Sequence, residues 1–386
     1  MNTNADYWFT IEPYVYIKIT SQCVFLYNTL DGEILESHKK DVIDFLNKIL
    51  HKENCGVVFL TNERYNQNSI NEFVKNVREK YMGDIISIDL SNGKPVQLFP
   101  YVNYSCDQAV YKKHNFSSFK NVLENLSEIS IHVDAITDIS KLIPVLISIP
   151  WSPTFNIVGD IFRVLDNWDM LCFFNKRLSP KIIFCSYDNF IPIDPVFDNN
   201  FSYRISVKFP INIQHWNDSR RLLLDQALPF EYVFDVSSNE DLLQMELLIE
   251  QYQIEKYQSH PVYTGDNISF FEQNVFLSRE DILSMPITIN DLFIRQVMNI
   301  YDYGKINILP NGDVYANLNH PVLGNVYTDN IYEVVQKEVS EGKSWFNVRN
   351  QSPCTDCVYQ WLCPSPSNYE IFIGRPNLCH VKKGEA

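Results

Sequence analysis

The sequence lacks an excess of basic side chains. Of its 386 residues, 32 are lysine or arginine and 47 are aspartate or glutamate, which gives a formal net charge of −15 at pH 7. Proteins that mainly bind a nucleic-acid backbone need a basic surface, because that surface displaces the counterions along the phosphates. The charge balance therefore argues against nucleic acid as a partner.

Long hydrophobic runs are also missing. The longest apolar stretches, such as Leu142 to Pro150, are far shorter than the ~20 residues of a membrane-spanning helix. Residues Met1 to Ile19 do not combine a basic segment with a long apolar run, as a secretory signal would. We therefore expect no membrane association and a cytoplasmic location, where thiols stay reduced.

Several catalytic signatures are absent as well. The sequence contains no phosphate-cradling glycine loop, no HExxH zinc motif and no GxSxG elbow. What remains is a composition with 45% hydrophobic and 20% charged residues, which is typical of globular proteins. The length predicts two or three domains with substantial cores.

The first 95 residues read as one small domain. Alternating apolar residues and a hairpin signal at Asp31-Gly32 predict a small sheet, and two stripes at helical spacing predict helices on either side of a short strand. Ser37 is a candidate N-cap for the first helix and Gly83 a candidate C-cap for the second. The expected elements are strands at 15–19, 24–29 and 33–35, a helix over 42–50, a strand at 56–60 and a helix over 70–81.

Residues 96–300 alternate between strand and helix patterns. Repeated βα units predict a parallel sheet, either open or curled into a partial barrel, with ligands at the carboxyl ends of its strands. The predicted strands are 128–133, 155–158, 181–185, 203–209 and 232–236, and the predicted helices are 161–174, 214–227 and 239–251.

Acidic residues stand at the ends of several of these strands. Asp134, Asp160 and Asp235 could meet in one pocket, together with Glu255 or His260 near the sixth strand. Acids at strand ends are also common as helix caps, so the alternative is that each acts only locally.

The strongest chemical signal lies in residues 301–386. Four of the nine cysteines form the pattern Cys354-x2-Cys357-x5-Cys363-x15-Cys379. Two cysteines two residues apart can grip one metal from a tight turn, and two more complete a set of four thiolates. The spacing predicts either zinc or an iron–sulfur cluster. The remaining five are interpreted as small buried hydrophobes: Cys23, Cys55, Cys106, Cys172 and Cys185.

The segment from Ile308 to Tyr315, followed by Leu323-Gly324-Asn325 and the cysteine run, resembles the SPASM (twitch-like) extension of radical SAM peptide maturases. In that family the extension holds two auxiliary 4Fe–4S clusters. The resemblance implies that Cys354, Cys357, Cys363 and Cys379 retain the second cluster. It also implies that the first cluster is lost, because Asn317 and Ser367 stand where that cluster takes cysteines.

The middle region is similar to a degenerate partial (β/α) barrel of radical SAM type. Radical SAM enzymes carry Cys-x3-Cys-x2-Cys after the first barrel strand, but here Asp134 to Asp138 occupy that place and the motif occurs nowhere. Gly159-Asp160 resembles a remnant of the glycine-rich motif that contacts the methionine part of S-adenosylmethionine. The N-terminal element order likewise resembles the winged-helix-like domain that recognises leader peptides by strand addition.

Together these features resemble the pseudo-radical-SAM proteins of Bacteroidales peptide-modification (RiPP) systems. The resemblance implies a non-catalytic accessory protein with one 4Fe–4S cluster and no functional S-adenosylmethionine site. It further implies two partners, a ribosomally made precursor peptide and a true radical SAM maturase. Two alternatives stay open, namely a peptide-modifying enzyme with non-radical chemistry in the barrel pocket and a zinc-stabilised binding module.

Overall fold

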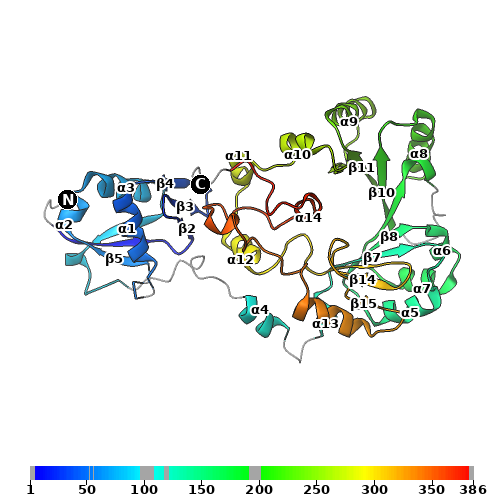
Figure 1. The fold of residues 1–386 in the computed structure, drawn as a ribbon, viewed down its shortest axis with the longest axis horizontal. Coiled ribbons are helices and arrows are strands. Elements are labelled where there is room, and N and C mark those ends of the chain that lie inside the picture. The colour runs from blue at the N-terminus through cyan, green and yellow to red at the C-terminus, as the bar shows by residue number, and fades with distance from the viewer. Residues whose placement is uncertain are drawn as a thin grey trace.

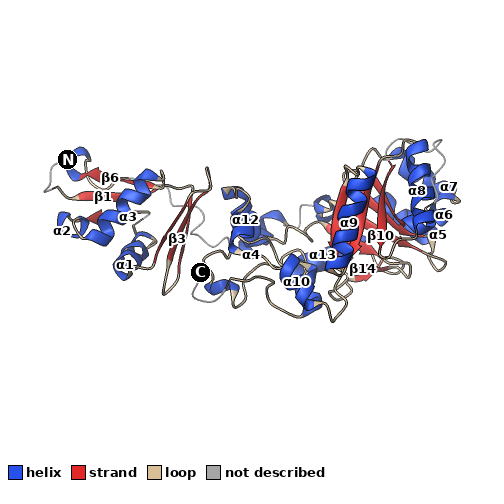
Figure 2. Cartoon of the chain, turned by 90° about the horizontal axis from the view of Figure 1, so that it is seen from above, coloured by secondary structure: helices blue, strands red, loops and turns tan. Residues whose placement is uncertain are grey.

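The computed structural model describes residues 5–51, 53–54, 56–95, 108–116, 121–190 and 201–381. The molecule is elongated, with two small N-terminal sheets at one end and one large sheet at the other (Figure 1). The cysteine-rich C-terminal segment lies between these two ends, as Figure 2 also shows from above. Cys55 and Cys106 lie outside the described residues. No helix of the described part is long and apolar enough to span a membrane.

The N-terminal region contains two antiparallel three-stranded sheets, in the orders β5-β1-β6 and β2-β3-β4. Phe9 and Phe45 are fully buried between the strands and helices, and their ring centroids are 5.1 Å apart. The elements are β1 (Tyr7–Ile11), β2 (Val15–Ile19), β3 (Val24–Asn28), β4 (Ile34–Ser37), α1 (Lys40–Ile49), β5 (Val57–Leu60), α2 (Asn62–Tyr65), α3 (Asn68–Glu79) and β6 (Gly83–Ser87).

The predicted hairpin and the order of helix, short strand and helix are confirmed in this region, but two predicted caps are wrong. The N-cap of α1 is Lys39 rather than Ser37, and the C-cap of α3 is Lys80 rather than Gly83. Gly83 instead opens β6, where a Cβ atom would overlap the carbonyl oxygen of Thr10. The glycine is needed for this close approach to β1, a strand the sequence patterns did not predict.

The large sheet has nine strands in the order β12-β11-β10-β9-β8-β7-β13-β14-β15. Neighbours from β12 to β13 run parallel, and β14 and β15 are antiparallel additions. The predicted parallel sheet is confirmed, and in the described residues it is open. Its strands are β7 (Glu128–Val133), β8 (Thr154–Gly159), β9 (Lys181–Ser186), β10 (Phe201–Lys208), β11 (Phe230–Val236), β12 (Tyr257–Pro261), β13 (Lys305–Ile308), β14 (Asp313–Tyr315) and β15 (Gly324–Asn325).

Helices cover one face of this sheet, and the opposite face carries most of the polar side chains of its strands. In β7, Ile129, Ile131 and Val133 are buried in the core, whereas Glu128 and His132 lie half-buried on the other face. This alternation follows from the two-residue period of a strand. The helices packed on the apolar face are α5 (Ile139–Ser148), α6 (Ile161–Leu165), α7 (Trp168–Lys176), α8 (Ile213–Asp225) and α9 (Asn239–Tyr252).

The single helix predicted over 161–174 is wrong, because the chain forms two helices there. Asn167 caps the second helix, α7, by accepting a hydrogen bond from the backbone N–H of Met170. An internal capping residue of this kind starts a new helix. The other described α-helices are α4 (Gln108–Asn115), α10 (Ile268–Asn274), α11 (Arg279–Leu283), α12 (Ile289–Val297), α13 (Ile331–Glu341) and α14 (Asn368–Ile373).

Replacing Gly159 by alanine is expected to destabilise the fold at the carboxyl end of β8. Gly159 has φ +102°, and a Cβ atom there would overlap the carbonyl oxygen of Val133. Gly265 provides the control, because its φ is +95° but a Cβ atom added there would have no neighbour within 4 Å. We expect Gly265→Ala to cost ~1–2 kcal/mol and Gly159→Ala ~3 kcal/mol or more. Urea unfolding of both variants tests this, and equal losses would contradict the steric argument.

Candidate metal centre

Three of the four predicted ligands are held by consecutive tight turns. Cys354 begins a short 3₁₀ helix, and the backbone N–H of Cys357 donates to its carbonyl oxygen at 3.1 Å. The backbone N–H of Cys363 donates to the carbonyl oxygen of Tyr359 at 2.9 Å. These turns fold residues 354–363 back on themselves, as is required for a Cys-x2-Cys motif to bind one metal ion.

Cys379 reaches the same region through a separate contact. It forms an isolated parallel bridge with Leu277, whose backbone N–H donates to the carbonyl oxygen of Leu378 at 3.0 Å. The side-chain amide of Asn377 also donates to the Cys379 sulfur at 2.9 Å. The bridge therefore fixes the distant fourth cysteine beside the first three.

The four thiols interact electrostatically and none forms a disulfide. Burial, with the neighbouring Cys354 and Cys379 as smaller causes, raises the pKa of Cys363 to about 12 and that of Cys357 to about 11. Burial is also the main cause of the raised pKa of Cys354. A cation that binds thiolates must therefore displace protons from buried sulfurs, and it would offset their mutual repulsion.

The four sulfurs lie in the same region, but they do not form a complete metal-binding site. Among the residues that the structure describes, no three or more histidine, cysteine, aspartate or glutamate side chains are placed to hold a metal ion. The chemistry of the donor set still fits a soft cation, because it offers four sulfurs, which suit zinc or iron–sulfur clusters. The ligand assignment stays a prediction.

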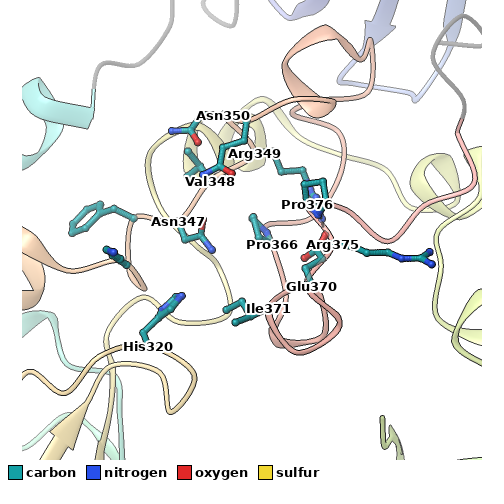
Figure 3. A pocket seen from close by; sticks show the side chains of 14 residues that line it. His320, Asn347, Val348, Arg349, Asn350, Pro366, Glu370, Ile371, Arg375 and Pro376 are labelled. Atoms are coloured by element: carbon teal, nitrogen blue, oxygen red, sulfur yellow. Dashed lines mark hydrogen bonds and ion pairs between the residues drawn. The ribbon is translucent and has the colours of Figure 1, made fainter. Parts of the chain in front are cut away.

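A buried ion pair lies directly behind the first cysteine. The Arg349 Nη1 atom lies 3.8 Å from the Cys354 sulfur and 2.9 Å from Oε1 of Glu370. These charged side chains are only 8% and 5% exposed. Figure 3 shows both among the residues around a neighbouring pocket. Sequence reasoning missed this pair, because its members are far apart in the chain and carry no motif.

The N-terminal sheet β2-β3-β4 covers the cysteine segment. Tyr16, Phe25 and Tyr27 form one hydrophobic cluster with side chains of the C-terminal half, and all three are at most 1% exposed. Phe25 and Tyr359 make an edge contact with centroids 5.0 Å apart. The other buried members of the cluster are Cys23, Ile282, Ile287, Leu292, Val358, Tyr359 and Leu362.

Polar contacts complete this interface. The Tyr16 hydroxyl donates to the carbonyl oxygen of Val358 at 3.1 Å, and the Lys18 ammonium donates to Oε1 of Gln360 at 2.7 Å. The Gln360 amide donates in turn to the Arg349 carbonyl oxygen at 2.6 Å. The N-terminal sheet β2-β3-β4 thus packs against the predicted ligand loop.

The two positions interpreted as lost ligands of the first auxiliary cluster lie close together. The Asn317 amide nitrogen is 2.9 Å from Oδ2 of Asp302 and 2.5 Å from Oδ1 of Asn368, the residue after Ser367. Asn317 is 4% exposed. The region therefore contains a closed network of carboxylate and amide groups.

The acids at the strand ends do not form one pocket. Asp160 caps α6 by accepting from the Phe162 N–H, and Asp134 accepts from the Ile136 N–H, so both act locally. Glu255 precedes β12, so it lies near the amino end of that strand, whereas the expected pocket is at the carboxyl ends. The predicted shared set is therefore wrong for these residues.

Asp235 and His260 are the pair that the structure does bring together. Oδ1 of Asp235 is 2.8 Å from Nδ1 of His260, and its Oδ2 accepts from the Ser206 hydroxyl at 3.0 Å. The three residues stand on neighbouring strands β10, β11 and β12, on the polar face of the sheet.

A cavity of about 480 Å³ lies at the carboxyl ends of β8 and β9. Its walls include Gly159, Phe184, Cys185 and Tyr203, and Asp160 is the one acidic group among the described residues that line it. Burial raises the pKa of Cys185 to about 12, so this thiol is neutral near pH 7. The cavity coincides with the Gly159-Asp160 motif singled out in the sequence.

Comparisons with known proteins give only distant similarity. No family model matches the chain, and no curated protein matches it. The fold is similar to native anSMEcpe with bound AdoMet and Kp18Cys peptide, with 12% identity and a TM-score of 0.43 over 61% of this chain and 88% of that one. It is also similar to Streptococcus suis SuiB bound to S-adenosylmethionine, with 11% identity and a TM-score of 0.34 over 96% of this chain and 98% of that one. Likeness at this level says nothing about the ligands of this chain.

Proposed function

We propose that the protein is a non-catalytic, pseudo-radical-SAM accessory protein that binds a precursor peptide and assists a separate radical SAM maturase. One observation carries the proposal. The loop after β7, where radical chemistry would need three cysteines, runs from Asp134 to Asp138 and contains none. Its polar groups serve the fold instead, since Asp138 caps α5 and the Asp134 backbone N–H donates to the Thr137 hydroxyl at 2.9 Å.

The four C-terminal cysteines would hold the cofactor, a single 4Fe–4S cluster. A cluster with four cysteine ligands has no vacant iron, so when bound it supplies structural stability or electron transfer. Arg349 and Asn377 direct N–H groups at the sulfurs of Cys354 and Cys379. Such donors stabilise negative charge on sulfur.

The N-terminal sheet is the proposed site for the leader part of the peptide. Strand β4 pairs with β3 alone among the described strands, which leaves its outer edge available for strand addition. The face of this sheet formed by Tyr16, Phe25 and Tyr27 is used against the cysteine segment. Peptide bound at the β4 edge would therefore lie next to the proposed cluster.

The full-length protein, purified without oxygen, tests the proposal. We expect about four iron and four sulfide per chain, and no release of 5′-deoxyadenosine from S-adenosylmethionine under dithionite. An intact radical SAM maturase assayed in parallel is the positive control. Cleavage of S-adenosylmethionine by this chain would overturn the non-catalytic proposal, and zinc without sulfide would replace it with the zinc-stabilised binding module. Co-purification with a maturase tests the partnership separately.

The contact between Asp235 and His260 favours a second candidate, an enzyme with non-radical chemistry on the polar face. A carboxylate that holds Nδ1 leaves Nε2 of the imidazole to exchange a proton with a substrate. Peptide modification measured with Asp235→Asn and His260→Gln distinguishes the candidates. Loss of modification in folded variants supports the enzyme candidate, and unchanged modification excludes it.

A further inference from the structure

The outer edge of β12 is the one long, open edge of the large sheet in the described residues. At the opposite end of the sheet, β15 spans only two residues, Gly324–Asn325, and so offers little backbone for pairing. Strand β12 spans five residues, Tyr257–Pro261, and pairs with β11 alone. Four of its five residues are exposed, and no other described strand pairs with its outer edge.

The register shows which backbone groups point away from the sheet. The Tyr232 N–H donates to the Lys256 carbonyl at 3.1 Å, and the Val262 N–H donates to the Val236 carbonyl at 2.7 Å. In a parallel ladder alternate residues bond to the same neighbour, so Gln258 and His260 also face β11. The N–H and C=O groups of Tyr257 and Ser259 therefore point outward.

This edge carries few of the features that usually block unwanted pairing. Proteins protect edge strands with charged side chains, bulges, proline or very short strands. The sequence of β12 is Tyr-Gln-Ser-His-Pro, with no lysine, arginine, aspartate or glutamate, and proline only at its end. An unguarded row of backbone donors and acceptors recognises one kind of partner, an extended polypeptide segment.

The neighbouring side chains add a second polar contact to the same edge. His260 is exposed on the polar face, and Asp235 contacts its Nδ1, so Nε2 is the ring nitrogen left to bond a side chain of an added strand. A second copy of this chain is a poor occupant, because a five-residue edge buries little area and each copy carries a net charge of −15.

We propose that the outer edge of β12 binds an extended segment of the peptide as an additional strand, next to the His260–Asp235 pair. The inference rests on the proposed peptide-binding function and adds a second contact site to it. The β4 edge lies at the N-terminal end of the molecule and β12 in the large sheet, so one long peptide could contact both. Backbone pairing makes the β12 site tolerant of peptide sequence, whereas His260 favours a side chain that bonds to imidazole.

Proline at position 259 gives a selective test. Ser259→Pro deletes one outward N–H and leaves the bonds to β11 intact, because proline is tolerated where an edge N–H faces solvent. Ser259→Ala is the matched control, since it removes the same hydroxyl and retains the N–H. Tyr257→Pro is a second variant at the other outward position. Unfolding midpoints within about 2 °C of the wild type identify the variants that are suitable for comparison.

The probe is a display library of random twelve-residue peptides selected on the full-length protein, followed by hydrogen exchange of the best binders. We expect bound peptide to slow exchange at Tyr257 and Ser259 at least tenfold, with affinity lost at least tenfold in Ser259→Pro and unchanged in Ser259→Ala.

Three outcomes would overturn the proposal. If the peptides bind Ser259→Pro and the wild type with equal affinity, and slow hydrogen exchange only outside β12, the β12 site is refuted and peptide binding is retained. Protection of Ser259 that rises with protein concentration and without peptide assigns the edge to a second copy. Failure to select any peptide refutes this site and the proposed function together.

Discussion

Replacing Cys363 by serine is expected to lower bound iron and sulfide from about four each per chain to below one. Cys363 lies among buried side chains and interacts with the other three predicted ligands. A hydroxyl binds iron far more weakly than a thiolate does, and no spare cysteine is among the groups acting on Cys363. Iron and sulfide analysis of anaerobically purified protein, with the visible absorption spectrum, measures the loss.

Cys172→Ser is the matched control for this experiment. Cys172 lies on α7, a helix that packs on the large sheet, and is outside the predicted ligand set, so its variant should bind metal like the wild type. Because metal binding adds to folding stability, stripping the wild type with a chelator should lower its unfolding midpoint toward that of Cys363→Ser. Full iron and sulfide in Cys363→Ser would contradict the ligand assignment.

Replacing Arg349 by methionine is expected to lower the free energy of unfolding by about 3–5 kcal/mol. The substitution keeps an apolar stem but leaves the buried Glu370 carboxylate without its charged partner. It also deletes the N–H donor to Cys354 and the bond from Nε to the Pro364 carbonyl oxygen, which is 2.6 Å long. Urea unfolding of the wild type and the variant gives the difference directly.

A double-mutant cycle separates this charge effect from lost packing. Glu370→Gln removes the carboxylate charge, so adding it to Arg349→Met should recover part of the lost stability. A positive coupling of at least ~1 kcal/mol between the two positions is expected. Strictly additive losses would show that the ion pair does not carry the effect. Arg221→Met, which removes an exposed arginine paired within α8, should change stability by less than ~0.5 kcal/mol.

The parallel sheet could be predicted because its strands have strong local signals. Residues 128–133, 181–185 and 232–236 combine apolar, β-branched and aromatic side chains, and each prediction falls within a strand of the structure. Strands of this type are defined by burial on the helix-covered face, which leaves a two-residue pattern in the sequence. The N-terminal hairpin was equally local, since Asp31-Gly32 marks its turn.

The errors arise where tertiary contacts decide the local structure. Gly83 resembles a helix cap in sequence, but its role depends on how closely β6 approaches Thr10, which is more than 70 residues away. Strand β1 has no alternation to reveal it, because Phe9, Thr10 and Ile11 are all buried between β5 and β6. Neither fact can be derived from neighbouring residues alone.

In the candidate site, too, local patterns could be predicted from the sequence and distant contacts could not. Spacing alone made Cys354, Cys357 and Cys363 candidate ligands, since the three lie close together in the sequence. Arg349 and its partner Glu370, and Lys18 with Gln360, could not be predicted, because each pair joins positions that carry no shared pattern. Of the five strand-end candidates, only Asp235 and His260 contact each other. Asp160 caps a helix, Asp134 bonds within its own turn, and Glu255 lies near the amino end of its strand.

The cover of the cysteine segment by the N-terminal sheet constrains the order of events during synthesis. Tyr16 and Lys18 leave the ribosome early, but their partners Val358 and Gln360 follow 342 residues later. At ~5–20 residues per second, this delay is on the order of 15–70 s. During that interval Phe25 and Tyr27 lack the contacts that Val358, Tyr359 and Leu362 supply, so the aromatic face of this sheet is completed only when translation is almost finished.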